Sequence, residues 1–279
     1  LVVKGDVRDV NKIKEVIKGK DVIIHLACIS NDPSFELNPK LGKEINFDCF
    51  KPLVLASKEE GIKHFIYASS SSVYGVKDTL NVTEEASLEP LTDYSKYKAE
   101  CEKVLLSNTD ANFIGTIIRP ATVCGYSPRQ RLDLVVNILT NFAFHKKKIQ
   151  IFGGAQLRPN IHINDMVDSY ICVLNAEKDK VSNQIFNVGF ENHSVETLAL
   201  MVKKNIKENI ELEFSKSDDN RSYHINSKKI SERLGFNPSK NIDLAIKDLI
   251  KAFEQKLLIN TFNNQEYFNI KKMQKINLV

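Results

Sequence analysis

Short runs of apolar, β-branched residues alternate along the first half of this chain with longer stretches of helical periodicity. Such runs predict strands, and their alternation with helices predicts a parallel sheet with helices on both faces, because parallel strands need crossover connections. We therefore expect an α/β chain with a Rossmann-like doubly wound parallel sheet. The strands are expected at residues 1–4, 22–27, 65–69 and 113–119, and the helices at residues 9–19, 38–60 and 93–107.

Local signals sharpen two of these elements. Asn38 and Pro39 form a cap followed by proline at the first helical position, so the second helix is expected to begin there. Pro52 lies inside the same helix and predicts a kink, since proline has no N–H to donate. The run at residues 22–27 is almost continuously apolar, which predicts a strand buried on both faces.

The pattern loosens after Gly125. Helical periodicity returns at residues 132–144, 164–176, 194–207, 227–234 and 242–257, with short strands expected at residues 149–152 and 184–188. The last 20 or so residues are polar and weakly patterned, which predicts a tail or a surface segment.

Composition excludes several classes of function. The 279 residues carry 39 basic and 35 acidic side chains, interspersed along the chain, so binding to nucleic acid is not expected. The lysine run at residues 146–148 is typical of a solvated loop. No apolar run approaches the ~18 residues of a membrane span, so no membrane association is expected. Five cysteines without a C-x-x-C pair indicate free thiols in a reducing, cytoplasmic setting.

Residues 94–98 read Y-S-K-Y-K and place Tyr94 and Lys98 on one face of an expected helix. An ammonium beside a phenol favours the phenolate and lowers the pKa of the tyrosine. The pair can therefore act as a general base that takes a proton from a hydroxyl near neutral pH. The spacing alone is weak support, because Tyr267 and Lys271 repeat it near the C-terminus.

The surroundings of Tyr94 distinguish it from that second tyrosine. The apolar strand expected at residues 65–69 runs into serines, and Ser70 precedes Tyr94 by 24 residues. Ligands bind at the carboxyl ends of strands in open α/β sheets. The serine run alone is compatible with a simple turn that ends at Gly75, but strand, serine and Tyr–Lys pair together favour a catalytic site.

Seven segments, in matching order and spacing, resemble the extended short-chain dehydrogenase/reductases, the nucleotide-sugar epimerase/dehydratase family. They are G-D-V-R-D at residues 5–9, H-L-A at 25–27, S-S-S-S-V-Y-G at 69–75, Y-S-K-Y-K at 94–98, R-P-A-T-V at 119–123, R-P-N-I-H-I-N-D at 158–165, and R-S-Y at 221–223 with S-K at 227–228 and L-G-F at 234–236. The resemblance spans about residues 1–257. It implies NAD as the cofactor, with NADP left open, and a nucleoside-diphosphate sugar as the substrate.

The resemblance also implies a role for each matching residue. Tyr94 matches the catalytic base, Lys98 the residue that bonds the nicotinamide ribose, and Ser70 the hydroxyl that holds the reacting oxygen. The implied cofactor positions, besides Tyr94 and Lys98, are Asp6 and Val7 at the adenine, Leu26, Ala27 and Ser69 along the cofactor, and Pro120 and Val123 at the nicotinamide. The implied substrate positions, besides Ser70, are Thr122 and two arginines at the pyrophosphate, Arg158 and Arg221.

Ser71 and Ser72 stand where the 4,6-dehydratases of the family have an Asp–Glu pair. A serine hydroxyl cannot replace a carboxylate as acid or base near pH 7. Epimerisation needs only the tyrosine, the serine and the cofactor, so we expect NAD-dependent epimerisation of the sugar at C4 through a 4-keto intermediate. A reductase of nucleotide keto-sugars is the alternative enzyme, and a non-catalytic nucleotide-binding relative is the alternative from another class.

Three other residues are expected to be structural. His25 lies in the apolar run at residues 22–27 and His162 at a strand end, and both are expected to be core histidines without a chemical role. Cys124 stands where the family often has tyrosine, and we expect a packing residue rather than a reactive thiol.

The sequence contains no glycine-rich phosphate loop. Its eleven glycines do not form the G-x-G-x-x-G or G-x-x-G-x-x-G spacing with which a dinucleotide fold approaches the cofactor pyrophosphate. In the resemblance Asp6 follows the third strand of the sheet, so the first βαβ segment is expected upstream of Leu1. We therefore expect weak cofactor binding by these residues and an exposed apolar sheet edge.

The change in pattern also predicts a division of the chain. We expect a truncated NAD-binding domain at residues 1–125 with a return segment at about 158–180, a smaller α/β substrate-binding domain at residues 126–157 and 181–258, and a C-terminal tail at residues 259–279. Sugar specificity is expected in the loop at residues 127–134, the loop at residues 153–154 and at Arg221. By analogy with the family, the helices that follow Asn38 and Asp93 predict a homodimer.

Overall fold

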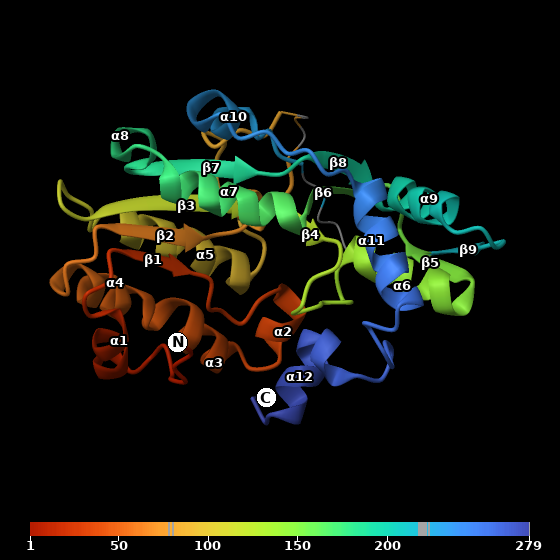
Figure 1. Ribbon diagram of the computed structural model, residues 1–279, viewed down its shortest axis with the longest axis horizontal. Coiled ribbons are helices and arrows are strands. Elements are labelled where there is room, and N and C mark those ends of the chain that lie inside the picture. The colour runs from red at the N-terminus through yellow and green to blue at the C-terminus, as the bar shows by residue number, and fades with distance from the viewer. Residues whose placement is uncertain (78, 80, 217–221, 223, 279) are drawn as a thin grey trace.

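The computed structural model describes residues 1–77, 79, 81–216, 222 and 224–278, so Arg221 lies outside the described residues. The largest described sheet has four parallel strands in the order β1-β2-β3-β7 (Figure 1). These strands are β1 (Val22–His25), β2 (His64–Ala68), β3 (Ile114–Pro120) and β7 (Gln184–Val188). Helices separate them along the chain, which confirms the predicted α/β fold with a parallel sheet.

Side chains of β2 alternate between two hydrophobic clusters. Phe65 and Tyr67 pack in one cluster, together with residues of α4 (Phe50–Glu59). Ile66 packs in the other, together with residues of α7 (Ile163–Asn175). Because successive side chains of a strand point to opposite faces, helices cover both faces of the sheet, and the doubly wound arrangement is confirmed.

The helix predicted at residues 38–60 is present but interrupted. It consists of α3 (Pro39–Lys43), a π-helical turn η1 (Glu44–Asp48) and α4. Pro52 accounts for the interruption, because it has no N–H to donate to the carbonyl of the residue four positions earlier. The helix widens by one residue in η1: the N–H of Cys49 donates to the carbonyl of Glu44, five residues earlier, at 3.2 Å.

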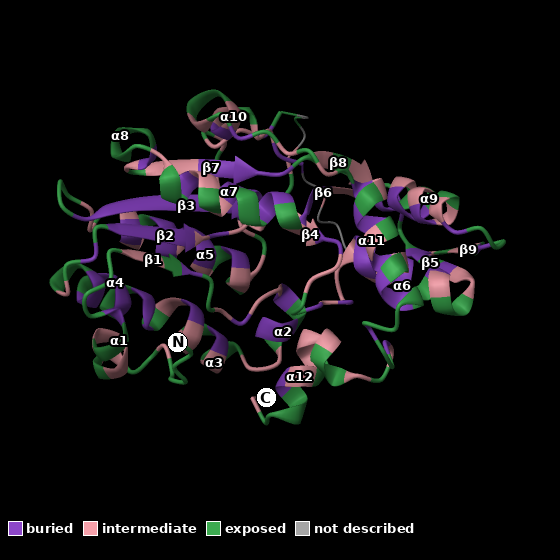
Figure 2. Cartoon of the chain, in the orientation of Figure 1, coloured by how far each residue is buried: buried purple, intermediate pink, exposed green. Residues whose placement is uncertain are grey.

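Two predictions for the N-terminal region are wrong. Residues 1–4 are exposed and form no strand, since they pair with no described strand. β1 is shorter than the run at residues 22–27 and is not buried on both faces: His25 is buried, but Ile24 is 40 % exposed. Figure 2 shows part of β1 in the colour of exposed residues. β1 is the edge strand of the described sheet and pairs only with β2, so no described strand covers its other hydrogen-bonding edge. The expectation of an exposed apolar sheet edge is confirmed.

The second half of the chain adds two smaller sheets. One consists of β4 (Thr122–Cys124), β6 (Leu157–His162) and β8 (Glu191–Ser194), and the other of β5 (Lys148–Phe152) and β9 (Glu211–Ser215). Of these five strands, β5 is predicted with nearly its observed bounds, and the strand end predicted at His162 is the end of β6. The strands β4, β8 and β9, and the start of β6, are short or rich in polar residues, so they lack the apolar pattern that marks a strand.

Three helices pack around the β5–β9 pair, namely α6 (Val135–Lys146), α9 (Val195–Asn205) and α11 (Ile242–Glu254). The helices predicted in these places are confirmed, with ends displaced by a few residues. The remaining helical elements are α1 (Val10–Ile17), α2 (Asp32–Glu36), η2 (Ser71–Tyr74), α5 (Asp93–Leu106), α8 (Lys178–Val181), α10 (Lys228–Leu234), η3 (Gln265–Tyr267) and α12 (Asn269–Lys275). Among the residues that the structure describes, no helix is long and apolar enough to cross a membrane.

The C-terminal segment folds back onto the body of the protein. α12 lies beside α2, below the junction of the two halves (Figure 1). Its Met273 is buried with Ile29 and Phe35. The predicted domain boundaries stay a prediction, although β7 lies within residues 181–258 and pairs with β3 in the first sheet.

Candidate active site

A pocket of about 960 Å³ lies at the carboxyl ends of β2 and β3. One wall consists of the segments that follow these two strands and of Tyr94 on α5, and another of the loop before α6 and α6 itself. This is the edge of a parallel sheet at which ligands bind, and the volume suits a small-molecule site. The lining includes seven residues that the sequence predicts for the site: Ser69, Ser70, Tyr94, Pro120, Thr122, Val123 and Arg158.

The structure brings Tyr94 and Lys98 together near the start of α5. Thr92 caps this helix, because its Oγ1 accepts the N–H of Ser95 at 3.2 Å. The Nζ of Lys98 lies 5.9 Å from the centroid of the Tyr94 ring and donates to the carbonyl of Ala68, at the end of β2, at 2.7 Å. Lys98 is only 4 % exposed. A buried ammonium is therefore fixed beside the phenol that faces the pocket.

His25 lies in the core next to this lysine. Its ring stacks on Tyr67 with 6.0 Å between the ring centroids. Burial, and to a smaller extent the positive charge of Lys98, lower the pKa of His25 to about 3. The ring is therefore neutral near pH 7, and the expectation of a core histidine is confirmed.

The serines after β2 have distinct partners. Ser70 caps η2: its Oγ accepts the N–H of Ser72 at 3.1 Å and lies 2.8 Å from the Oγ of Ser72. Ser69 is buried, and its hydroxyl donates to the carboxylate of Glu102 on α5. The hydroxyl of Ser69 is thus engaged inside the protein, whereas Ser70 lines the pocket with its side chain held in place.

A buried ion pair supports this end of the sheet. Arg119 of β3 donates to both carboxylate oxygens of Glu102, at 3.0 Å and 2.6 Å. The guanidinium also donates to the hydroxyl of Tyr74 at 2.8 Å, and that hydroxyl donates to Asn187 of β7 at 2.7 Å. The network ties α5 to the ends of the strands that border the pocket. No local pattern predicts this network, because its members are far apart along the chain.

The residues implied for the adenine end of the cofactor lie outside this pocket. Asp6 binds the guanidinium of Arg8 at 2.7 Å, and hydrogen bonds from Arg8 lower the pKa of its carboxyl group. Val7, Leu26 and Ala27 do not line the pocket, and the latter two are exposed beyond β1. The roles assigned to these four residues stay predictions, as does that of Arg221.

The residues at the other end fit the nicotinamide ribose of NAD. Among the described residues, the ammonium of Lys98 donates to Ala68 alone, which leaves two of its three N–H donors for ribose hydroxyls. Pro120 and Val123 provide apolar pocket wall beside Tyr94. Planar aromatic rings such as nicotinamide pack well on such a wall.

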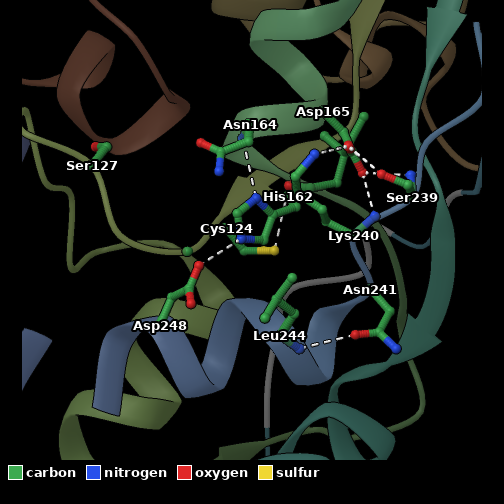
Figure 3. A network of polar contacts seen from close by, with 12 residues as sticks. Cys124, Ser127, His162, Asn164, Asp165, Ser239, Lys240, Asn241, Leu244 and Asp248 are labelled. Atoms are coloured by element: carbon green, nitrogen blue, oxygen red, sulfur yellow. Dashed lines mark hydrogen bonds and ion pairs between the residues drawn. The ribbon is translucent and has the colours of Figure 1, made fainter. Parts of the chain in front are cut away.

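His162 and Cys124 belong to a structural network at the junction of β6 and α7 (Figure 3). The Nδ1 of His162 accepts the N–H of Asn164, so its proton lies on Nε2, which donates to Asp248 at 3.1 Å. Cys124 is buried, donates to the carbonyl of Ile161 at 3.4 Å, and has its pKa raised to about 12, mainly by burial. Both residues are structural, as expected.

Sequence reasoning missed part of the pocket wall. Residues 30–33, which follow β1, line the pocket together with Arg131 and Asp133 of the predicted specificity loop. Asn269 of α12 lies behind them and donates to Ser30 at 3.0 Å. A weakly patterned C-terminal segment gives no sequence signal for such a contact.

A doubly wound α/β chain with a serine, a tyrosine and a lysine at the carboxyl edge of its sheet has the architecture of a Rossmann-like dehydrogenase/reductase. The family model described as the NAD dependent epimerase/dehydratase family matches residues 1–189, and the chain belongs to this family. NAD, which the resemblance implies, is the cofactor of that family.

Individual relatives agree with this assignment. A UDP-glucose 4-epimerase of Lactobacillus helveticus is 24 % identical over 263 residues, which cover 86 % of this chain and 79 % of that protein. A dTDP-glucose 4,6-dehydratase of Streptomyces griseus is 24 % identical over 249 residues, which cover 87 % of this chain and 73 % of that protein. The solved structure of MoeE5 in complex with UDP-glucose and NAD has a TM-score of 0.80 and 25 % identity, with 92 % of this chain and 86 % of MoeE5 covered.

Proposed function

We propose that this protein uses NAD to epimerise a nucleoside-diphosphate sugar, at C4 and through a transient 4-keto sugar. The observation that carries the proposal is that Ser70 and Tyr94 line the same pocket and that the ammonium of Lys98 lies 5.9 Å from the centroid of the Tyr94 ring. Its relatives include both epimerases and dehydratases, so the choice between the two reactions depends on the side chains around this group.

Each member of the group has one task in the reaction. Tyr94 takes the proton of the substrate hydroxyl, and Lys98 favours the phenolate form because its positive charge lies near the ring. Ser70, fixed by its contacts with Ser72, holds the reacting oxygen. NAD, when bound, would supply a reversible hydride acceptor beside the sugar carbon. Once the keto sugar has turned over in the site and the hydride returns to its other face, Tyr94 gives its proton back to the same oxygen.

The other polar groups favour epimerisation over loss of water. Dehydration needs a further acid and a further base, and neither Ser71 nor Ser72 ionises near pH 7. The carboxylates that line the described pocket belong to Asp32 and Asp133. Asp32 accepts a hydrogen bond from a threonine hydroxyl at 2.5 Å, and Asp133 binds a guanidinium and a backbone N–H, each at 2.9 Å. Both are therefore engaged within the protein.

The substrate assignment rests on two arginines and on the relatives. Arg158 of β6 lines the pocket, and a guanidinium suits the oxygens of a diphosphate. Arg221 is proposed for the same role from the sequence alone. The names of the relatives make UDP-glucose the first substrate to test. The homodimer stays a prediction. The cytoplasmic setting also stays a prediction, and the five free cysteines support it because free thiols are typical of reducing compartments.

The test is a turnover assay with NAD and UDP-glucose, followed by chromatographic separation of the two C4 epimers. The proposal expects interconversion of the epimers without net change at the nicotinamide absorbance band. Stoichiometric reduction of NAD with oxidation of the sugar, which is the reverse of keto-sugar reduction, would support the keto-sugar reductase instead. Binding of NAD and nucleotide sugar without any turnover would support the non-catalytic relative.

A further inference from the structure

The C-terminal segment packs directly beside the candidate catalytic group. Met273 of α12 is buried in a cluster with Ile29 and Phe35, and Tyr94 packs against the same cluster. The carbonyl of Tyr267, just before α12, accepts the N–H of the buried Leu132 at 2.9 Å. These contacts hold the start of α12 against two segments that border the pocket.

Asn269, the first residue of α12, connects these two segments. Its side-chain Nδ2 donates to the Oγ of Ser30 at 3.0 Å, in the segment after β1. Its backbone N–H donates to Oδ2 of Asp133 at 2.9 Å, in the loop before α6, so Asp133 satisfies an N–H of the first turn of α12. Its Oδ1 accepts from the guanidinium of Arg129 at 3.1 Å.

The two residues that Asn269 holds both bind Arg131. The Nη1 of Arg131 donates to the Oγ of Ser30 at 3.1 Å, and its Nε donates to Oδ1 of Asp133 at 2.9 Å. Ser30, Arg131 and Asp133 all line the pocket. The guanidinium is therefore fixed on two of its edges by residues that α12 fixes in turn.

Donor capacity remains on this guanidinium. The Nη2 of Arg131 is shielded from solvent and has no hydrogen-bond partner among the described residues. A buried donor without an acceptor is unfavourable, and an anionic oxygen is the acceptor that a guanidinium binds most strongly. A ligand that places such an oxygen at Arg131 removes this penalty.

We propose that Asn269 is a positioning residue, which holds Ser30 and Asp133 so that Arg131 can bind an anionic oxygen of the nucleotide sugar. The inference rests on the proposed function for the identity of the ligand. The oxygen belongs either to the diphosphate or to a carboxylate on the sugar, because both offer the same charge and geometry. Fixing the guanidinium in advance lowers the conformational entropy that substrate binding must remove.

The experiment compares Asn269→Ala with Gln274→Ala, an exposed residue of the same helix, in the protein with excess NAD. Calorimetry gives the Kd of UDP, UDP-glucose and UDP-glucuronic acid, and turnover gives KM and kcat. Asn269→Ala removes the side-chain bond to Ser30 but keeps the backbone N–H on Asp133. We expect it to raise Kd and KM about 5- to 10-fold with kcat within about twofold, and Gln274→Ala to leave Kd, KM and kcat unchanged. Weaker binding of all three ligands identifies the diphosphate as the group that Arg131 binds. Weaker binding of UDP-glucuronic acid alone identifies a sugar carboxylate.

Arg131→Lys provides a second test that leaves Asn269 intact. This variant keeps the positive charge but loses the planar guanidinium, so it should raise the Kd of the same ligands. Adding Asn269→Ala to Arg131→Lys should raise Kd by a smaller factor than Asn269→Ala does in the unmodified protein. Unchanged Kd values in Asn269→Ala and Arg131→Lys, or an equal loss in Gln274→Ala, overturn the inference. Tight binding without epimerisation leaves it standing while the proposed function fails, and a protein that binds none of the three ligands contradicts both.

Discussion

Two Tyr–Lys pairs with the same spacing occupy different regions of this protein. Tyr94 and Lys98 share one continuous helix, α5, and the tyrosine lines the pocket. Tyr267 ends η3, whereas Lys271 lies in α12, so a break in the helix separates them. The ammonium of Lys271 donates to the carbonyl of Phe262 at 2.8 Å, and Tyr267 packs against a hydrophobic cluster.

The difference shows which structural conditions a tyrosine and a lysine four residues apart need in order to form a catalytic pair. Four residues bring two side chains onto one face only where the helix is unbroken. The helix must also be fixed at the carboxyl edge of the sheet, which the ion pair of Glu102 with Arg119 does for α5.

The largest expected effect is on turnover. Tyr94→Phe removes the proposed base, so we expect kcat to fall by about 10³-fold while NAD binding is retained. Tyr267→Phe is the matched control and should leave kcat within about twofold. Steady-state epimerisation rates for both variants test this, and near-normal turnover in Tyr94→Phe would remove the basis of the mechanism.

The anchor of α5 should account for the next largest effect. Glu102→Ala leaves Arg119 buried without its partner, so we expect the free energy of unfolding to fall by about 3–5 kcal/mol. Glu100→Ala on the same helix breaks the exposed pair with Lys103 and should cost less than about 1 kcal/mol. Urea denaturation measures both, and similar losses in the two variants would contradict the role of the buried pair.

Substitution of Lys98 and of Lys271 should differ in its effect on kcat, by less than the effect of Tyr94→Phe. Lys98→Met keeps the length of the side chain but removes the ammonium beside Tyr94, so we expect kcat to fall by about 10²-fold and its pH optimum to move upward. Lys271→Met should alter neither quantity. A pH profile of kcat distinguishes loss of the charge from a general loss of structure, because only the former moves the optimum.

The last prediction concerns a different quantity, the stability of the fold against acid. Burial lowers the pKa of His25 to about 3 and that of His64 to about 4, both below the ordinary ~6.5. Below pH 6.5 the unfolded chain binds protons that the folded protein does not. The free energy of unfolding should therefore fall as the pH drops from about 6.5 toward 4, by about 1.4 kcal/mol per pH unit for each histidine.

A variant checks the contribution of the histidine that lies nearer the site. His25→Phe should remove about half of this pH dependence when unfolding is measured by denaturant at a series of pH values. An unchanged slope would show that His25 is not held neutral beside Lys98.

Much of the fold could be predicted from local pattern. Apolar runs marked β2, β3 and β7, because strands buried on both faces are almost continuously apolar. The strand predicted at residues 1–4 is absent, although the run is apolar, because an apolar run becomes a strand only where another strand pairs with it. The short strands β4, β8 and β9 have no such signal, because tertiary contacts, and not their own residues, make them extended.

The candidate site divides in the same way. Helical periodicity and strand ends are local properties, so the sequence alone is enough to predict Tyr94 and Lys98 on one helix and Ser70 after a strand. The contacts of Glu102 with Arg119 and of Asn269 with Ser30, 239 residues away, arise only in the folded protein. Such pairs form when packing brings distant segments together, and no pattern within either segment encodes the distance between them.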